Sequence, residues 1–226
     1  MRLREAIYSS VFSRKVPSGT LITDVKLMQQ QYNKATISLY IGPMFSGKTD
    51  RMLRELRTHA RVSSALVILF KYSKDDREEG SIVLSRSGAS SKATAMISTG
   101  REAWSNVKDS IAGSYMKSIV VIGIDEGQFI DGIDWFVQKV LTTKLRSRVT
   151  FKVHIAALDS TFKAEMWDRV VKLIPYCHKV RKSCAVCSLC QILPAQLTKK
   201  ISGSAEQLEE IGSDQYKAVC LGCYER

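Results

Sequence analysis

Short, almost uninterrupted runs of apolar residues recur along the chain and alternate with stretches in which apolar side chains are spaced three or four positions apart. The short runs are rich in β-branched and aromatic residues and are bounded by polar segments, which is typical of strands buried on both faces. The predicted strands are residues 36–41, 65–70, 94–97, 118–124 and 149–158. The helical spacing predicts helices directly after residue 49 and over residues 101–111 and 135–145.

The alternation of strands and helices predicts an α/β fold, a parallel sheet flanked by helices. We expect this nucleotide-binding domain to span residues 35–182 and to contain a flexible, Ser- and Gly-rich loop at residues 85–92. Residues 1–34 form a basic extension that we expect to be flexible. Residues 183–226, where cysteines cluster, are expected to form a small, ribbon-like zinc-binding domain that carries a lid loop.

The first predicted strand and helix are joined by a glycine-rich segment with the pattern G-x-x-x-x-G-K-T. Its residues are Gly42, Pro43, Met44, Phe45, Ser46, Gly47, Lys48 and Thr49. A strand before it and a helix after it are the context of a phosphate-binding loop, because backbone N–H groups and the helix N-terminus both face the anion. Lys48 would reach the β- and γ-phosphates of a nucleoside triphosphate, and the Thr49 hydroxyl would bind Mg²⁺. A glycine turn that merely precedes Lys-Thr is the alternative interpretation.

An acidic pair, Asp125 and Glu126, follows the predicted strand 118–124. An apolar strand that ends in Asp, downstream of a phosphate loop, resembles the Walker B arrangement, in which the carboxylate holds Mg²⁺ directly or through water. Glu126 could then take the proton from an attacking hydroxyl or water. A solvent-exposed acidic strand end is the alternative, and the phosphate loop upstream favours the functional interpretation.

Two C-x-x-C pairs, Cys187 with Cys190 and Cys220 with Cys223, lie near the end of the chain. Four thiolates suit a closed, structural Zn²⁺ site that leaves no open position for chemistry. Cys184 leaves the ligand set open, because Cys184 and Cys187 have the same spacing. Buried free thiols would explain the same residues without a metal.

The chain has 226 residues and a formal net charge of +12, which favours anionic partners without choosing between phosphates and nucleic acid. No apolar run approaches the ~20 residues needed to cross a bilayer, so no membrane partner is expected. We expect a cytoplasmic protein. The basic, serine-containing start of the chain is also compatible with a mitochondrial presequence.

Taken together, these motifs resemble those of the type II (cytosolic-type) thymidine kinases. The resemblance runs from about residue 35 to residue 226. It rests on the phosphate loop, on DEGQF at residues 125–129, and on both cysteine pairs in this order. Further matching segments are residues 71–77 (KYSKDDR), 157–162 (ALDSTF), 173–175 (LIP), 185–190 and 214–223.

The resemblance implies a kinase that transfers the γ-phosphate of ATP, with Mg²⁺, to the 5′-hydroxyl of thymidine, an activity of nucleotide salvage. Glu126 is then the general base, and Asp125 is the magnesium carboxylate. The residues implied to contact the ATP phosphates are those of the loop together with Asp75, Arg77, Asp125 and Gln128. The residues implied to line the nucleoside site are Met44, Phe129, Leu158, Phe162, Trp167, Ile211, Gly212 and Tyr216.

The resemblance also implies a zinc-held lid at approximately residues 202–216, whose backbone hydrogen-bonds thymine, and a homo-oligomer, typically a tetramer. The chain departs from the family pattern at several positions. Cys184 replaces a Thr that normally helps to hold the nucleoside, and the lid lacks its second glycine. Asp50 follows the phosphate loop where Ser or Thr is usual, and residues 85–87 read Ser-Arg-Ser near the place of the usual Thr-His-Asp.

Two other functions fit parts of the sequence. The altered lid is compatible with a kinase-like protein that binds nucleotide but has lost nucleoside turnover and serves as a regulatory or structural subunit. The charge of +12 is compatible with a nucleic-acid-stimulated ATPase that carries a zinc ribbon. The sequence shows no basic patch interleaved with aromatic residues, and the DEGQF motif fits that ATPase poorly, so nucleic acid is not the expected partner.

Overall fold

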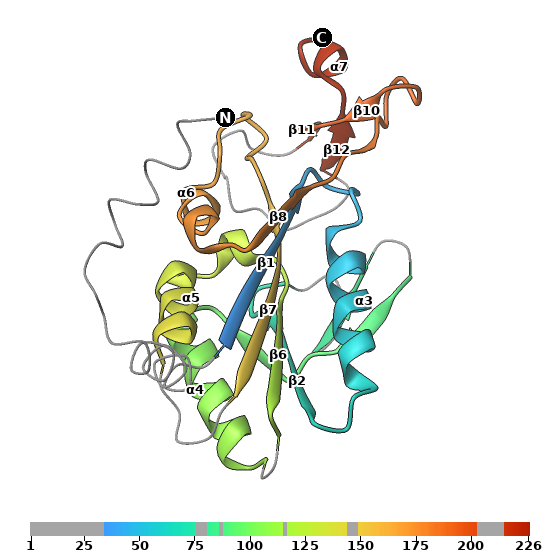
Figure 1. Ribbon diagram of the computed structural model, residues 1–226. Helices are drawn as coiled ribbons and strands as arrows, with labels where there is room; N and C mark the ends of the chain where they lie inside the picture. The colour runs from blue at the N-terminus through green and yellow to red at the C-terminus, as the bar shows by residue number, and fades with distance from the viewer. Residues whose placement is uncertain (1–33, 76–80, 86–87, 115–116, 144–148, 203–214) are drawn as a thin grey trace, which may run out of the picture.

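The structure is a computed structural model and describes residues 34–75, 81–85, 88–114, 117–143, 149–202 and 215–226. In this part of the chain, a six-stranded parallel sheet with the order β5-β2-β6-β7-β1-β8 forms the centre of the molecule (Figure 1). Its strands are β1 (Lys34–Gly42), β2 (Ala65–Tyr72), β5 (Ala95–Ile97), β6 (Ile119–Ile124), β7 (Thr150–Leu158) and β8 (Lys179–Lys182). Because the strands are parallel, the loops that follow their carboxyl ends meet at one edge of the sheet.

Helices cover both faces of this sheet (Figure 1). On one side lies α3 (Lys48–Ala60), whose buried residues Met52, Leu53 and Leu56 pack on the sheet. On the other side lie α4 (Gly100–Ala112) and α5 (Ile133–Thr142), which close the larger hydrophobic core. Fully burying an aliphatic or aromatic side chain contributes about 1.5–3 kcal/mol, so these apolar stripes account for the layered arrangement.

The predicted α/β architecture is confirmed. All five predicted strands occur, with ends shifted by two residues or fewer. The helix predicted at residues 101–111 is α4, and its start is fixed by a capping box between Thr99 and Glu102. The helix predicted at residues 135–145 is α5. It begins at Ile133, two residues earlier than predicted, and the preceding Gly132 has a left-handed backbone. Part of its predicted end lies outside the described residues.

The prediction of a flexible loop at residues 85–92 was wrong in part. Residues Ser90–Lys92 form β4, which pairs antiparallel with β3 (Ile82–Leu84) to make a short hairpin. The hairpin is held by backbone pairing and by the burial of Val83, and neither is visible in a Ser-rich stretch. The sheet also gains β8, a Lys-Val-Arg-Lys strand with four exposed residues that has no apolar signal and forms because β1 offers it a free edge.

The cysteine-containing segment lies beyond the carboxyl edge of the sheet (Figure 1). It contains β9 (Ala185–Val186), β10 (Pro194–Ala195), β11 (Leu197–Lys200), β12 (Tyr216–Val219) and the short helix α7 (Leu221–Tyr224). Two antiparallel pairs, β9 with β10 and β11 with β12, surround a small core that includes three of the cysteines. Residues 1–33 of the predicted extension and most of the predicted lid lie outside the described residues, and Lys34 begins β1.

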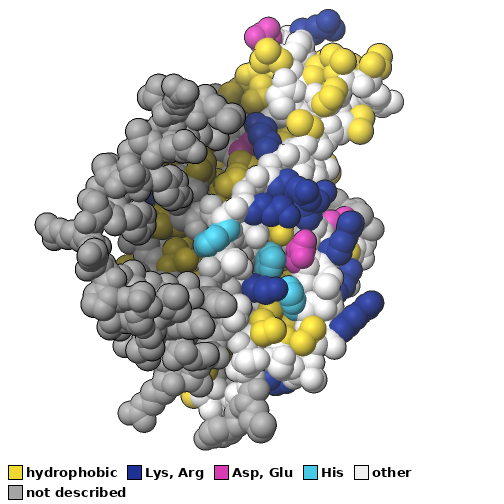
Figure 2. All heavy atoms as spheres, in the orientation of Figure 1, with side chains coloured by type: hydrophobic (Ala, Val, Ile, Leu, Met, Phe, Trp, Pro, Cys, Tyr) yellow, Lys and Arg dark blue, Asp and Glu magenta, His cyan; other side chains and the backbone are white. Residues whose placement is uncertain are grey.

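The surface of the sheet and helix layer is basic on one side. Figure 2 shows that Lys and Arg side chains gather over β8 and α3, with histidine side chains beside them. Across the described residues, no helix combines the length and the apolar character that a membrane crossing requires.

Candidate active site

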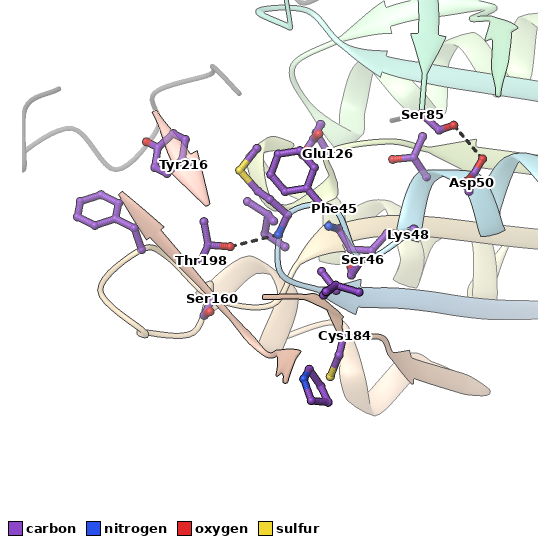
Figure 3. Close-up of a pocket in the computed structure, with 18 of the residues that line it drawn as sticks. Phe45, Ser46, Lys48, Asp50, Ser85, Glu126, Ser160, Cys184, Thr198 and Tyr216 are labelled. Atoms are coloured by element: carbon purple, nitrogen blue, oxygen red, sulfur yellow. Dashed lines mark hydrogen bonds between the residues drawn. The ribbon is translucent and has the colours of Figure 1, made fainter. Parts of the chain in front are cut away.

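A cavity of about 660 Å³ opens at the carboxyl edge of the sheet (Figure 3). The phosphate loop and the ends of β6 and β7 form its floor, and the β3–β4 hairpin bounds one end. The cysteine-containing segment supplies the opposite wall through residues of β9, β10, β11 and β12. This volume falls within the range typical of sites for small molecules and cofactors.

The loop at residues 42–49 has the backbone of an anion cradle. Gly42 has φ +146°, and a Cβ there would lie 2.2 Å from the Ser183 carbonyl oxygen, so only glycine fits. Gly47, at the N-terminus of α3, has φ +76°, and Phe45 is also left-handed. This alternation turns successive N–H groups toward the cavity. The Lys48 Nζ atom donates to the Pro43 carbonyl at 2.7 Å, which folds the ammonium group back over the loop.

Thr49 and Asp125 come together behind the loop. The Thr49 hydroxyl donates to the Asp125 Oδ1 atom at 2.9 Å, although the two residues are 76 positions apart. Asp125 ends β6 and is 3% exposed. A hydroxyl and a carboxylate oxygen at this distance are ligands of the hard kind that Mg²⁺ prefers.

Glu126 lines the cavity from the turn after β6, where the 3₁₀ turn η1 (Gly127–Phe129) begins. Its backbone is left-handed, with φ 51°, which is uncommon for a residue with a side chain. The buried amide of Gln128 fixes the direction of its carboxylate: Nε2 donates to Glu126 Oε2 at 2.7 Å, while Oε1 accepts from the Leu158 N–H at 2.9 Å. This amide therefore ties the carboxylate to the end of β7.

Aromatic side chains form the wall beside Glu126. Phe129 meets Trp167 edge to face with ring centroids 5.5 Å apart, and Tyr72 supports Phe129 from behind at 5.3 Å. Phe162 and Tyr216 form a second aromatic pair, with centroids 6.3 Å apart, on the side of the cysteine-containing segment. Such rings present flat apolar surfaces that suit a planar base.

Two hydroxyl-bearing residues in the cavity were not among the predicted site residues. The Thr198 Oγ1 atom accepts from the Met44 N–H at 3.2 Å, so strand β11 contacts the phosphate loop directly (Figure 3). Ser160 also lines the cavity, and its buried hydroxyl has no hydrogen-bond partner within the described residues. Thr198 belongs to no motif, and Ser160 lies in the 157–162 segment of the resemblance, which did not single it out.

The four paired cysteines come together as a metal site requires. The Sγ atoms of Cys187, Cys190, Cys220 and Cys223 all lie within 4.8 Å of one another. A tetrahedron with Zn–S bonds of about 2.3 Å has edges of roughly 3.8 Å, and Cys190 and Cys220 are separated by 3.9 Å. The donor set therefore fits Zn²⁺. Cys184 is exposed in the cavity and is not part of this group. The structure therefore favours a ligand set of the two C-x-x-C pairs over one that includes Cys184.

The thiols of this cluster are electrostatically unequal. Burial opposes ionisation of Cys187, but hydrogen bonds from backbone N–H groups, first those of Cys190 and Cys220, lower its pKa to about 6. The side-chain hydrogen bond with Cys220 and then burial raise the pKa of Cys223 to about 12. A cation at the centre would favour the thiolate form of every member.

The structure brings most of the predicted site residues to one cavity. Its lining includes Met44, Phe45, Ser46, Gly47, Lys48, Thr49, Glu126, Phe129, Leu158, Phe162, Trp167 and Tyr216. Asp75, at the end of β2, and Gln128 are buried and are not among the described lining residues. Arg77, Ile211 and Gly212 lie outside the described residues.

Comparisons with known proteins agree with this geometry. The family model described as thymidine kinase matches residues 35–224. The thymidine kinase of Monkeypox virus is 30% identical over 203 residues, which are 85% of this chain and 98% of the relative. The thymidine kinase of Rabbit fibroma virus (strain Kasza) is 34% identical over 189 residues, 83% of this chain and 95% of the relative. The cytosolic thymidine kinase of Gallus gallus is 33% identical over 192 residues, 84% of this chain and 77% of the relative.

Proposed function

The chain belongs to the thymidine kinase family, and we propose that it transfers the γ-phosphoryl group of ATP to the 5′-hydroxyl of thymidine with Glu126 as the general base. One observation carries the residue assignment. The carboxylate of Glu126 lines the same cavity as the phosphate loop and is held there by the Gln128 amide at 2.7 Å. This position beside the phosphate loop supports Glu126 as the base.

The chemical step follows from these positions. Glu126 takes the proton of the 5′-hydroxyl as the alcohol oxygen forms a bond to the γ-phosphorus, and the bond from that phosphorus to the β-phosphate bridging oxygen breaks, so ADP leaves. The backbone N–H groups of residues 42–49 and the Lys48 ammonium stabilise the charge on the phosphates. Thr49 and Asp125 would hold the Mg²⁺ that accompanies ATP, and this ion would neutralise further charge on the phosphates.

The aromatic wall and the cysteine-containing segment are assigned to bind the nucleoside. Phe129, Trp167 and Phe162 offer surfaces for the thymine ring, and Leu158 and Met44 complete the apolar lining. The lid predicted at residues 202–216, with Ile211 and Gly212, would add backbone hydrogen bonds to the base edge. Mispairing a buried donor or acceptor costs about 1–3 kcal/mol, which is enough to separate thymine from cytosine.

The remaining expectations follow from the family. We propose that residues 183–226 act as a unit in which Cys187, Cys190, Cys220 and Cys223 bind a structural Zn²⁺, and that the protein forms a homo-oligomer, with a tetramer as the expected state. A cytoplasmic location is proposed because the chicken relative is named as the cytosolic enzyme. Within the described residues, no observation favours a protein that has lost turnover or a nucleic-acid-stimulated ATPase.

Substitution of Glu126 by Gln tests the assignment of the base. The change preserves the size of the side chain and removes the proton acceptor, and a general base contributes about 10²–10⁴-fold, so we expect kcat for thymidine to fall by that factor. The dissociation constant for ATP should stay within about twofold, because the phosphate loop is untouched. The measurement is γ-phosphate transfer to each of the four deoxynucleosides, together with direct ATP binding.

The matched control is Glu225→Gln, which changes an exposed carboxylate in the C-terminal tail and should leave kcat unchanged. If Glu126→Gln kept most of the wild-type turnover, Glu126 would not be the base. If the wild-type chain phosphorylated another deoxynucleoside in preference to thymidine, the substrate assignment would be wrong while the role of Glu126 could stand.

A further inference from the structure

A hydrogen bond joins the phosphate-loop helix to the β3–β4 hairpin at the edge of the cavity. The Ser85 hydroxyl donates to the Asp50 Oδ1 atom at 2.8 Å, across 35 positions of sequence (Figure 3). Asp50 lies in the first turn of α3, directly after Thr49, and Ser85 directly follows β3. Both residues line the cavity, at the end away from Tyr216 (Figure 3).

Ser85 is held firmly enough to orient its partner. It is 4% exposed, and its Oγ atom also accepts from the Ala89 N–H at 3.0 Å. Its own backbone N–H donates to the Ala89 carbonyl at 2.8 Å. The hydroxyl therefore acts as acceptor within the hairpin and as donor toward Asp50, and this arrangement directs the donor hydrogen at the carboxylate.

The hairpin is docked on α3 along its length. Val83 and Ala93 are buried in the same hydrophobic cluster as Met52, Leu53 and Leu56 of α3, and the Arg57 NH2 group donates to the Ser90 carbonyl at 2.9 Å. Of the α3 residues named here, Asp50 lies nearest in sequence to the phosphate loop, and it bonds Ser85 of the hairpin. This bond places Leu84 and Ser85 in the cavity wall beside Lys48.

Because Asp50 is negatively charged, this contact affects the binding of ATP. A carboxylate one residue from Thr49 repels a triphosphate if it turns toward the loop, because like charges a few ångströms apart interact strongly in a partly desolvated site. A hydrogen bond to a buried hydroxyl holds the carboxylate toward the hairpin instead.

We propose that Asp50 and Ser85 form a positioning pair that keeps the Asp50 carboxylate turned away from the phosphates and keeps the hairpin wall in place, so that the pair sets the affinity for ATP without taking part in proton transfer. This inference rests on the proposed function, since it assigns ATP to the phosphate loop. Removing the Ser85 hydroxyl frees the carboxylate and weakens ATP binding, whereas removing the carboxylate itself removes the repulsion. Both changes leave the nucleoside half of the cavity intact.

The test is a double-mutant cycle on the full chain with Ser85→Ala, Asp50→Ala and the combined variant. In Ser85→Ala the freed carboxylate is expected to raise KM and the dissociation constant for ATP about fivefold to tenfold, with kcat and KM for thymidine within about twofold of wild type. Asp50→Ala, which has no carboxylate to repel the phosphates, should bind ATP within about twofold of wild type. The combined variant should bind ATP like Asp50→Ala, because loss of the Ser85 hydroxyl has no effect once the carboxylate is gone. Asp50→Asn keeps an acceptor oxygen and should bind ATP like wild type.

Ser90→Ala is the matched control, because it removes a hydroxyl from the same hairpin outside the cavity lining. The proposal is overturned if Ser85→Ala binds ATP like wild type, if the combined variant is as weak as Ser85→Ala, or if Asp50→Asn binds ATP more weakly than wild type. A thermal unfolding scan identifies a variant that has lost its fold, and Ser85→Cys, which keeps a weak donor, then replaces Ser85→Ala. If wild type bound ATP but did not phosphorylate thymidine, the proposed function would fail, while ATP binding would still decide the role of the pair.

Discussion

At the scale of single residues, the position of the carboxylate at 126 depends on a backbone conformation that side chains rarely adopt. A left-handed residue other than glycine costs on the order of 1 kcal/mol, so its neighbours must hold it in place. Gly127 allows close packing, since a Cβ there would lie 2.6 Å from Ile155 Cγ2. Gln128 then bonds both the carboxylate and the end of β7. Glu126 is therefore oriented before any substrate binds.

Substitution of Gln128 by Leu tests this orientation. The change removes the bonds to Glu126 and to the Leu158 N–H, so we expect kcat to fall about tenfold and ATP affinity to stay within about twofold. In a Glu126→Gln background the same substitution should lower kcat no further, because there is no base left to orient. The measurement is steady-state kinetics of the two single variants and the double variant.

Gln138→Leu, at an exposed position of α5, is the control for the change in side-chain chemistry. An equal loss of kcat in Gln128→Leu with and without Glu126 would show that Gln128 acts only through the fold. That outcome would remove its role as a positioning residue.

At the scale of elements, β1, β7 and α3 enclose a histidine that no catalytic argument requires. His154 lies on β7, is 7% exposed, and stacks on Tyr40 of β1 with ring centroids 6.1 Å apart. Its Nδ1 atom is 3.2 Å from the Tyr40 hydroxyl. Burial is the largest cause that lowers the pKa of His154 to about 4, and Glu55 of α3 opposes it, while His59, Lys152 and Lys179 add to it.

This packing predicts how stability depends on pH. An unfolded histidine has a pKa near 6.5, so between about pH 6.5 and 4 the unfolded chain binds a proton that the folded chain does not. Stability should therefore be complete above pH 6.5 and fall as the pH approaches 4, by about 3 kcal/mol at most from this residue. The measurement is the free energy of unfolding in urea at several pH values in this window.

His154→Phe keeps the ring stacked on Tyr40 and removes the titrating group. Relative to wild type, its free energy of unfolding should depend less steeply on pH between 4 and 6.5, and the carboxylates that titrate below pH 5 contribute equally to both proteins. Parallel pH curves for the two proteins would contradict the assignment.

At the scale of the whole molecule, one half of the cavity lies on the central sheet and the other half on the cysteine-containing segment. The phosphate loop, Glu126 and the aromatic wall lie on the central sheet and its loops. Thr198 and Tyr216 lie on the β11–β12 pair, in which Thr198 pairs with Ala218, and Cys220 directly follows β12. The bond from Met44 to Thr198 joins the two halves.

We therefore expect removal of the proposed Zn²⁺ to weaken thymidine binding more than ATP binding. Incubation with a zinc chelator, or Cys223→Ser, is expected to raise KM for thymidine about tenfold or more, because the wall that carries Thr198 and Tyr216 loses its internal clamp. The dissociation constant for ATP should change by less than about threefold. The measurement is zinc content per chain, together with KM for thymidine and direct ATP binding.

Cys177→Ser is the control, because Cys177 is half-buried outside the cluster. If chelation weakened ATP and thymidine binding equally, the cluster would support the whole fold and not one half of the cavity. If zinc were absent from the purified wild-type chain, the metal assignment would fail.

The sequence predicted correctly those features that are formed by one strand or one loop. Buried strands such as β2 and β6 are continuous apolar runs. In the phosphate loop, a Cβ at position 42 would collide with the Ser183 carbonyl, and the left-handed backbone at position 47 favours glycine. The exposed strands β4 and β8 left no such trace, since their order comes from pairing with neighbours. The bond from Met44 to Thr198 and the bond between Asp50 and Ser85 were likewise invisible, because each joins segments that are distant in sequence.

The sequence by itself determined the α/β class, the phosphate loop, the acidic pair at the end of β6 and the two cysteine pairs, because each is set by residues close together along the chain. Only the tertiary structure decided that Cys184 stands apart from the metal ligands, that Gln128 holds Glu126, and that Ser85 holds Asp50. Those outcomes depend on distances between side chains. Such distances are fixed by packing of the sheet, its helices and the cysteine-containing segment, and not by spacing along the chain.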